Sequence, residues 1–167
     1  MNRRHFLWAA CAGLVCGTVG VGMAMPKPGQ VVPDFTLNLL DGGKISLKEL
    51  RGKPVLLTFW HSGCPHCQRE VPVLNQVHEQ YKARGLVILS VSVVWDKEQL
   101  ARMFVEVYKP VFRVGWDASG EIGSLFNIEA TPTSVFIGRA GQFADINVGS
   151  LELTEYQRRI DALLKMK

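Results

Sequence analysis

Apolar positions along the chain follow two periods, which alternate between residue 34 and residue 165. Short runs that are wholly apolar, or that alternate apolar and polar residues, are typical of strands. The predicted strands are residues 34–39, 55–59, 86–94, 134–137 and 143–148. Residues 55–59 and 86–94 are almost continuously apolar, which predicts strands that are buried on both faces of a sheet.

Between the strands, apolar residues recur every three or four positions, which is the period of an amphipathic helix. The predicted helices are residues 64–84, 97–108, 119–126 and 154–165, with a single turn at 46–49. Ser46 and Glu49 have the spacing of a capping box, and Pro72 should kink the first long helix. This order predicts an α/β domain with a central mixed β-sheet flanked by helices, and a turn at 41–44 adds an N-terminal β-hairpin extension.

The first 24 residues have the composition of an export signal. The segment Arg3-Arg4-His5-Phe6-Leu7 resembles a twin-arginine signal, and an apolar stretch without acidic residues follows it. Small residues at Gly22 and Ala24 suit cleavage after Ala24. We therefore expect a signal peptide at 1–24, or an N-terminal membrane anchor if the segment is not cleaved.

Composition and charge narrow the remaining possibilities. The chain has 167 residues, of which 47% are hydrophobic, so residues 33–167 suit one globular domain behind a Pro-containing linker at 25–32. The net charge is +4, but Lys and Arg are dispersed and no basic run is interleaved with aromatic residues. Nucleic-acid binding therefore has little support, and the leader predicts a periplasmic or other extracytoplasmic location.

The domain has one pair of cysteines, in the motif Cys64-Pro65-His66-Cys67 that follows the buried strand. Two thiols separated by two residues at the start of a helix can close into a disulfide and reopen, which predicts thiol–disulfide exchange. The helical period places Cys67 on the buried side and Cys64 at the solvent-facing first turn. A structural disulfide, or half of a metal site completed by nearby histidines, are the alternatives.

The motifs together resemble the thioredoxin superfamily, and within it the exported thiol:disulfide oxidoreductases of the TlpA/ResA/DsbE type. The resemblance runs from about Gly29 to Lys165. It is carried by three segments and by the strand and turn at residues 135–141. These segments are Pro33-Asp34-Phe35, residues 59–72 and Thr131-Pro132-Thr133. The resemblance implies a thioredoxin-like fold. The chain departs from the family pattern at Gly63, where Trp is common, and at Thr58, where thioredoxin has a buried Asp.

The resemblance also implies roles for particular residues. Cys64 would be the attacking nucleophile, Cys67 would resolve the mixed disulfide, and Pro132 would be a cis-proline that faces the sulfurs. Glu70 matches a carboxylate that relays the proton of Cys67, although the helical period alone favours a surface residue that pairs with Lys or Arg. The residues expected to contact or support the substrate are Trp60, Pro65, His66, Thr131 and Pro132.

The function expected from these features is reduction of disulfides in exported proteins, such as apocytochrome c. Electrons would come from a membrane thiol carrier, with no metal and no small-molecule cofactor. His66 favours an alternative, a DsbA-like oxidant, because DsbA-like proteins carry the same Pro-His pair. A copper metallochaperone is a second alternative. A peroxiredoxin is disfavoured because Leu57 and His61 stand where its motif has Pro and Thr or Ser.

Overall fold

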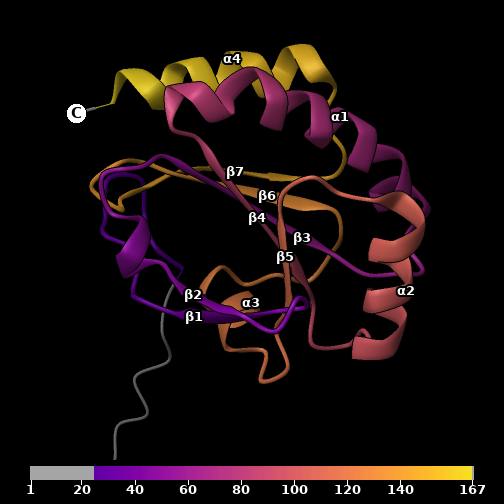
Figure 1. The fold of residues 1–167 in the computed structure, drawn as a ribbon. Coiled ribbons are helices and arrows are strands. Elements are labelled where there is room, and N and C mark those ends of the chain that lie inside the picture. Colours follow the sequence, from indigo (N-terminus) through magenta and orange to yellow (C-terminus); the bar gives the residue numbers. More distant parts are fainter. Residues whose placement is uncertain (1–24, 167) are drawn as a thin grey trace, which may run out of the picture.

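The computed structural model describes residues 25–166, which form a seven-stranded mixed sheet covered by helices on both faces (Figure 1). The strands are β1 (Thr36–Leu39), β2 (Lys44–Ser46), β3 (Val55–Trp60), β4 (Val87–Ser92), β5 (Arg113–Trp116), β6 (Thr133–Ile137) and β7 (Phe143–Val148). The helices are α1 (Pro65–Tyr81), α2 (Glu98–Tyr108), α3 (Glu121–Leu125) and α4 (Leu153–Lys165), with 3-10 turns η1 (Lys48–Leu50) and η2 (Lys82–Arg84).

The strand order across the sheet is β2-β1-β5-β4-β3-β6-β7. Strands β3, β4 and β5 are mutually parallel, whereas β6 is antiparallel to β3. The register pairs Phe59 near the end of β3 with Thr133 at the start of β6. The segment after β3 and the segment before β6 therefore meet at the same end of the sheet, and the cysteine motif lies at this end.

The core has two sides because the residues of each central strand alternate between the two faces of the sheet. On one side Leu56 of β3 packs with residues of α1 and α4, and Trp60 packs with α1 and α2. On the other side Leu57 and Phe59 pack with α3 and with the segment that precedes β1. All six residues of β3 are buried, which confirms that this strand is buried on both faces.

The predicted elements are confirmed within a few residues of their bounds, with one exception. Strand β5 was not predicted, because its four residues Arg-Val-Gly-Trp form neither a long apolar run nor a clear alternation. The capping box is confirmed, since the Ser46 amide donates to Glu49 Oε2 at 2.7 Å and the Glu49 amide donates to Ser46 Oγ at 3.2 Å. Pro72 lies inside α1, where it has no N–H to donate to the preceding turn.

The segment at 25–32 runs beside the start of β7. Gly29 donates to the Phe143 carbonyl, and Val32 donates to the Gly141 carbonyl. Val32 is completely buried. The expected leader at 1–24 lies outside the described residues. Within 25–166, no helix combines the length and the apolar character that crossing a membrane requires.

Candidate active site

Cys64 and Cys67 are joined by a disulfide at the N-terminus of α1. Pro65 occupies the first turn of the helix, where a residue without an N–H costs no hydrogen bond. Cys64 is the N-cap residue, and its Sγ accepts a hydrogen bond from the Cys67 amide at 3.1 Å. The helix end thus directs an N–H and the positive end of its dipole at Cys64 Sγ, which favours a thiolate there when the disulfide opens.

Both sulfurs are shielded, so the prediction that Cys64 faces solvent is wrong. Cys64 is 4% exposed and Cys67 is 3% exposed. The carbonyl oxygen of Thr131 lies 3.7 Å from Cys64 Sγ, and Phe104 of α2 belongs to the same buried cluster as the two cysteines. The period of a single helix could not reveal this cover, because it comes from segments far away in the chain.

Trp60 belongs to the same buried hydrophobic cluster as the two cysteines. Its ring stacks on Phe104 with 4.2 Å between the centroids, and the residue is only 5% exposed. Trp60 therefore supports the site through packing. In contrast, Pro65 and His66 are exposed on the outer side of the motif, where an incoming protein can reach them.

The loop before β6 covers the disulfide from the other side. The Thr131–Pro132 peptide bond is cis, as predicted. Pro132 is buried, and its carbonyl accepts a hydrogen bond from the Gly149 amide at 2.8 Å. Thr131 is half-buried, and its carbonyl oxygen lies beside Cys64 Sγ at the edge of the site.

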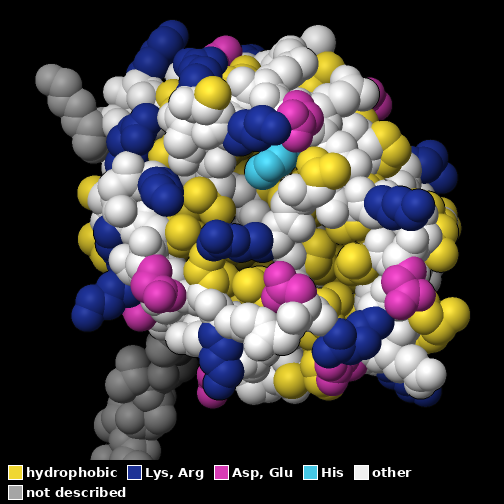
Figure 2. Space-filling view, viewed as in Figure 1, with side chains coloured by type: hydrophobic (Ala, Val, Ile, Leu, Met, Phe, Trp, Pro, Cys, Tyr) yellow, Lys and Arg dark blue, Asp and Glu magenta, His cyan; other side chains and the backbone are white. Residues whose placement is uncertain are grey.

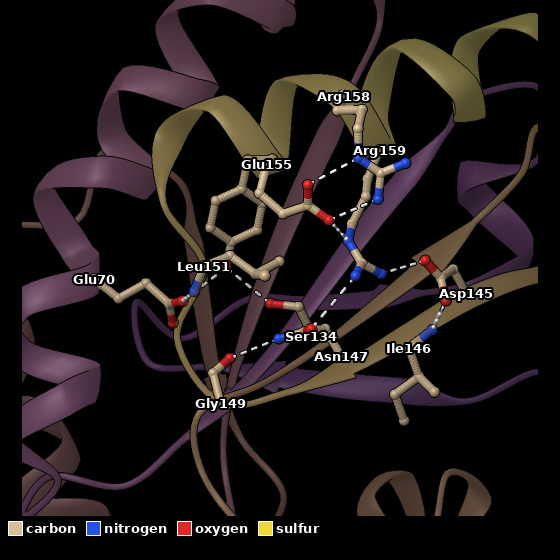
Figure 3. Close-up of polar contacts among 11 residues, drawn as sticks. Glu70, Ser134, Asp145, Ile146, Asn147, Gly149, Leu151, Glu155, Arg158 and Arg159 are labelled. Carbon is tan, nitrogen blue, oxygen red and sulfur yellow. Dashed lines mark hydrogen bonds and ion pairs between the residues drawn. The ribbon is translucent and has the colours of Figure 1, made fainter.

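Glu70 is buried, so the alternative prediction of a surface residue paired with Lys or Arg is wrong. The Leu151 amide and the Tyr156 hydroxyl each donate to Glu70 Oε1 at 3.0 Å (Figure 3). Burial raises the pKa of Glu70, and these two hydrogen bonds partly oppose the rise. A signal was present in the sequence, because position 70 stands three residues after Cys67 and four before Leu74, on the apolar stripe of α1.

Glu70 and Cys67 line the same small cavity. Its volume is about 10 Å³, close to what a single water requires. Trp60 also lines this cavity, and its indole Nε1 has no hydrogen-bond partner among residues 25–166. Thr58 also lines the cavity, and its hydroxyl donates to the Ser90 hydroxyl at 3.1 Å. Among the residues that line this cavity, Glu70 is the one with a carboxyl group.

His66 points along the outside of α1 toward Arg69. Its Nδ1 lies 3.1 Å from Arg69 Nη2. Because a guanidinium only donates hydrogen bonds, Arg69 is the donor in this contact.

Two residues at the site were not assigned a role from the sequence. Asp96, which follows β4, accepts from the Ser62 amide and the Ser62 hydroxyl at 2.7 Å each, and so holds the turn that leads to Cys64. His61 Nδ1 lies 2.8 Å from Thr131 Oγ1. Neither contact has a local sequence signal, because the partners are 34 and 70 residues apart.

A larger cavity lies away from the disulfide. It measures about 610 Å³ and includes Val87 and Arg113, the first residues of β4 and β5. Figure 2 shows the face over β5 and α2, where hydrophobic side chains lie among Lys, Arg, Asp and Glu side chains. Because β3, β4 and β5 are parallel, this cavity is at the end of the sheet opposite to the sulfurs. Within residues 25–166, no three His, Cys, Asp or Glu side chains form a group that could hold a metal ion.

Comparison with known proteins adds three findings. The model of the AhpC/TSA family matches residues 28–146. The thiol-disulfide oxidoreductase ResA of Bacillus thuringiensis subsp. konkukian (strain 97-27) is 31% identical over 159 residues, which cover 88% of this chain and 91% of that protein. A crystal structure from Chlorobium tepidum, assigned as thiol:disulfide interchange protein DsbE, matches with a TM-score of 0.76 and 30% identity, covering 83% of this chain and 99% of the other. The thioredoxin-like fold is thereby confirmed.

Proposed function

This chain belongs to the AhpC/TSA family and is a thiol–disulfide oxidoreductase of the ResA and DsbE type, and from that premise we propose that it works as an exported reductase of protein disulfides. The observation that carries the proposal is the buried carboxyl of Glu70 in the same cavity as Cys67. A carboxyl whose pKa is raised by burial can take a proton from a thiol more readily than an ordinary one.

The proposed cycle starts from the reduced protein. The Cys64 thiolate attacks one sulfur of a substrate disulfide, and the S–S bond breaks as the second substrate sulfur leaves as a thiolate and takes a proton from solvent. Cys67 then loses its proton to Glu70, directly or through a water in the shared cavity. Its sulfur attacks Cys64 Sγ and releases the first substrate sulfur as a thiolate. The substrate gains two electrons, and the disulfide between Cys64 and Cys67 forms.

The substrate is proposed to lie along the loop before β6. Thr131 offers backbone groups beside Cys64 Sγ, and these can pair with an extended peptide as a strand does. Pro65 and His66 are exposed between the two cysteines in the chain and would contact the flanks of the same peptide. Trp60 would support this surface from below.

The proposed direction of electron flow is reduction of the substrate disulfide, and the contacts of His66 bear on this direction. A cationic His66 beside Cys64 would stabilise the thiolate and make the disulfide more oxidising. The imidazole of His66 instead contacts the Arg69 guanidinium, with 3.1 Å between Nδ1 and Nη2, and this contact would compete with one to the Cys64 thiolate. The proposed donor of electrons is a membrane thiol carrier, and apocytochrome c is the proposed substrate. No metal or small-molecule cofactor takes part.

Export is proposed from the leader at 1–24, with its twin-arginine pattern and its small residues before a cleavage position. The domain would then work in the periplasm or another extracytoplasmic space, cleaved from the leader or held by it at the membrane. In an oxidising compartment, the disulfide of such a reductase must be reduced again by a partner after each cycle. This requirement agrees with a thiol carrier in the membrane.

The deciding experiment is the equilibrium potential of the Cys64–Cys67 pair against glutathione, measured with Cys64→Ser and Cys67→Ser variants as controls. A reductase should lie nearer to thioredoxin, at about −270 mV, than to DsbA, at about −120 mV. A potential near or above the DsbA value would overturn the reductase proposal and favour the oxidant. Stoichiometric copper binding without insulin reduction would favour the metallochaperone.

Glu70→Gln tests the proton step separately. The amide cannot accept the Cys67 proton, so resolution of the mixed disulfide should slow by about 10²-fold or more, as expected for a lost general base. The first attack by Cys64 should change far less, because Glu70 lies beside Cys67. Rapid-mixing measurements of the two steps check this, and equal slowing of both steps would contradict the assigned role.

A further inference from the structure

A side-chain hydrogen bond joins the two loops that flank the disulfide. His61 lies in the turn between β3 and Cys64, and Thr131 lies in the loop before β6. The imidazole Nδ1 of His61 is 2.8 Å from Thr131 Oγ1. This contact connects residues 70 positions apart, directly at the proposed site of substrate binding.

The contact is part of a closed loop of interactions around one sulfur. The Cys64 amide donates to the His61 carbonyl at 3.1 Å, so residue 61 is fixed relative to the nucleophile. The Thr131 carbonyl is 3.7 Å from Cys64 Sγ. Movement of Thr131 relative to the sulfur would therefore require the bond to His61 to break or lengthen.

The turn that carries His61 is itself held in place. Ser62 is bonded to the buried Asp96 through both its amide and its hydroxyl, at 2.7 Å each. A Cβ atom added to Gly63 would lie 3.6 Å from His61 Cδ2 and 3.7 Å from its Nε2, so the ring lies against the backbone of this exposed glycine. His61 thus connects a rigid turn to Thr131.

We propose that His61 is a positioning residue that holds Thr131 in the orientation in which its backbone pairs with a substrate peptide. The inference rests on the peptide-binding role proposed above for Thr131. Ordering a loop residue costs conformational entropy at the moment of binding, and a bond that orders it beforehand removes part of that cost. Loss of one neutral hydrogen bond should weaken peptide binding by about three- to tenfold.

The test uses the mixed disulfide in a Cys67→Ser background, where Cys64 stays bonded to its partner. The measured quantity is the equilibrium constant for exchange between a peptide with one central cysteine and 2-mercaptoethanol, which has no peptide backbone. His61→Ala should reduce the preference for the peptide by about three- to tenfold. Thr131→Val should have a similar effect, whereas His61→Asn and Thr131→Ser, which keep polar partners, should restore most of the preference.

The double variant His61→Ala/Thr131→Val should be no worse than either single variant, because both remove the same bond. Additive losses, or an unchanged preference in His61→Ala, would overturn the inference. Urea unfolding of each variant shows that it is folded, and if His61→Ala does not fold, Thr131→Val and Thr131→Ser decide by themselves.

A peptide whose backbone amides beside the cysteine are N-methylated separates this inference from the proposal beneath it. If N-methylation does not weaken binding to the chain with His61 intact, the proposed peptide pairing at Thr131 is wrong. The proposed role of His61 is then wrong as well, because it depends on that pairing. If N-methylation weakens binding but His61→Ala does not, only the role of His61 is wrong. The mixed disulfide forms in either direction of electron flow, so an oxidising potential would leave this test intact.

Discussion

Replacement of Tyr156 by Phe should lower the stability of the fold by an amount that depends on whether Glu70 is ionised. Tyr156 of α4 is completely buried, and its hydroxyl donates to Glu70 Oε1 at 3.0 Å and contacts Ser134 Oγ at 2.8 Å. Burial raises the pKa of Tyr156 well above its usual value, so this hydroxyl stays protonated near neutral pH. Tyr156→Phe removes one oxygen and keeps the ring against Phe136.

The magnitude depends on the charge of Glu70. A hydrogen bond to a carboxylate contributes about 1.5–3 kcal/mol, and one to a neutral carboxyl contributes about 0.5–1.5 kcal/mol. The hydroxyl thus favours the ionised form, and its removal should raise the pKa of Glu70 further. Because the pKa of Glu70 is already raised by folding, the extra cost of the variant appears as pH rises through that pKa.

Urea unfolding of the two proteins between about pH 4 and about pH 8 measures this difference. The variant should lose about 0.5–1.5 kcal/mol of unfolding free energy at the acidic end and about 1.5–3 kcal/mol at the basic end. Tyr108→Phe is the matched control, since its hydroxyl is not bonded to Glu70, and its cost should not vary with pH. A Tyr156→Phe cost that is constant or larger in acid would refute the reasoning.

Two further predictions concern the sulfurs and the sheet. Cys67→Ser should trap substrates as mixed disulfides through Cys64, visible on non-reducing gels, and failure to trap any partner would contradict the assigned order of attack. Gly115→Ala should destabilise the fold by about 1–3 kcal/mol, because the new Cβ would lie 2.5 Å from the backbone oxygen of Asn38 where β5 meets β1. Gly43→Ala, whose Cβ would make ordinary contacts, is the control in denaturant unfolding.

Local patterns in the sequence were enough to predict most of the architecture. The apolar run at 55–59, the capping box of Ser46 and Glu49, and the helical stripe after Cys64 are signals between residues close together in the chain. The motif of two cysteines at a helix start also indicated the chemistry, because a thiol and its neighbouring helix end interact over a single turn. The late Thr131-Pro132 pair was identified through its resemblance to a family.

Other features depend on contacts between distant segments, and no local pattern contains them. Strand β5 is a strand because β1 and β4 supply hydrogen-bond partners on its two sides. Cys64 is buried because Thr131 and α2 cover it. Each of these features depends on a partner segment that lies far away in the chain, and the local sequence does not identify that segment.

The sequence by itself therefore determined the two sulfurs, the helix that presents them and the sheet that carries the helix. Only the tertiary structure decided which groups surround the sulfurs. Glu70 became a buried acid because Leu151 and Tyr156, more than 80 residues further along the chain, bond to its carboxyl group. The reason is physical, since burial and long-range hydrogen bonds set the protonation and orientation of side chains, and both arise only when the elements pack together.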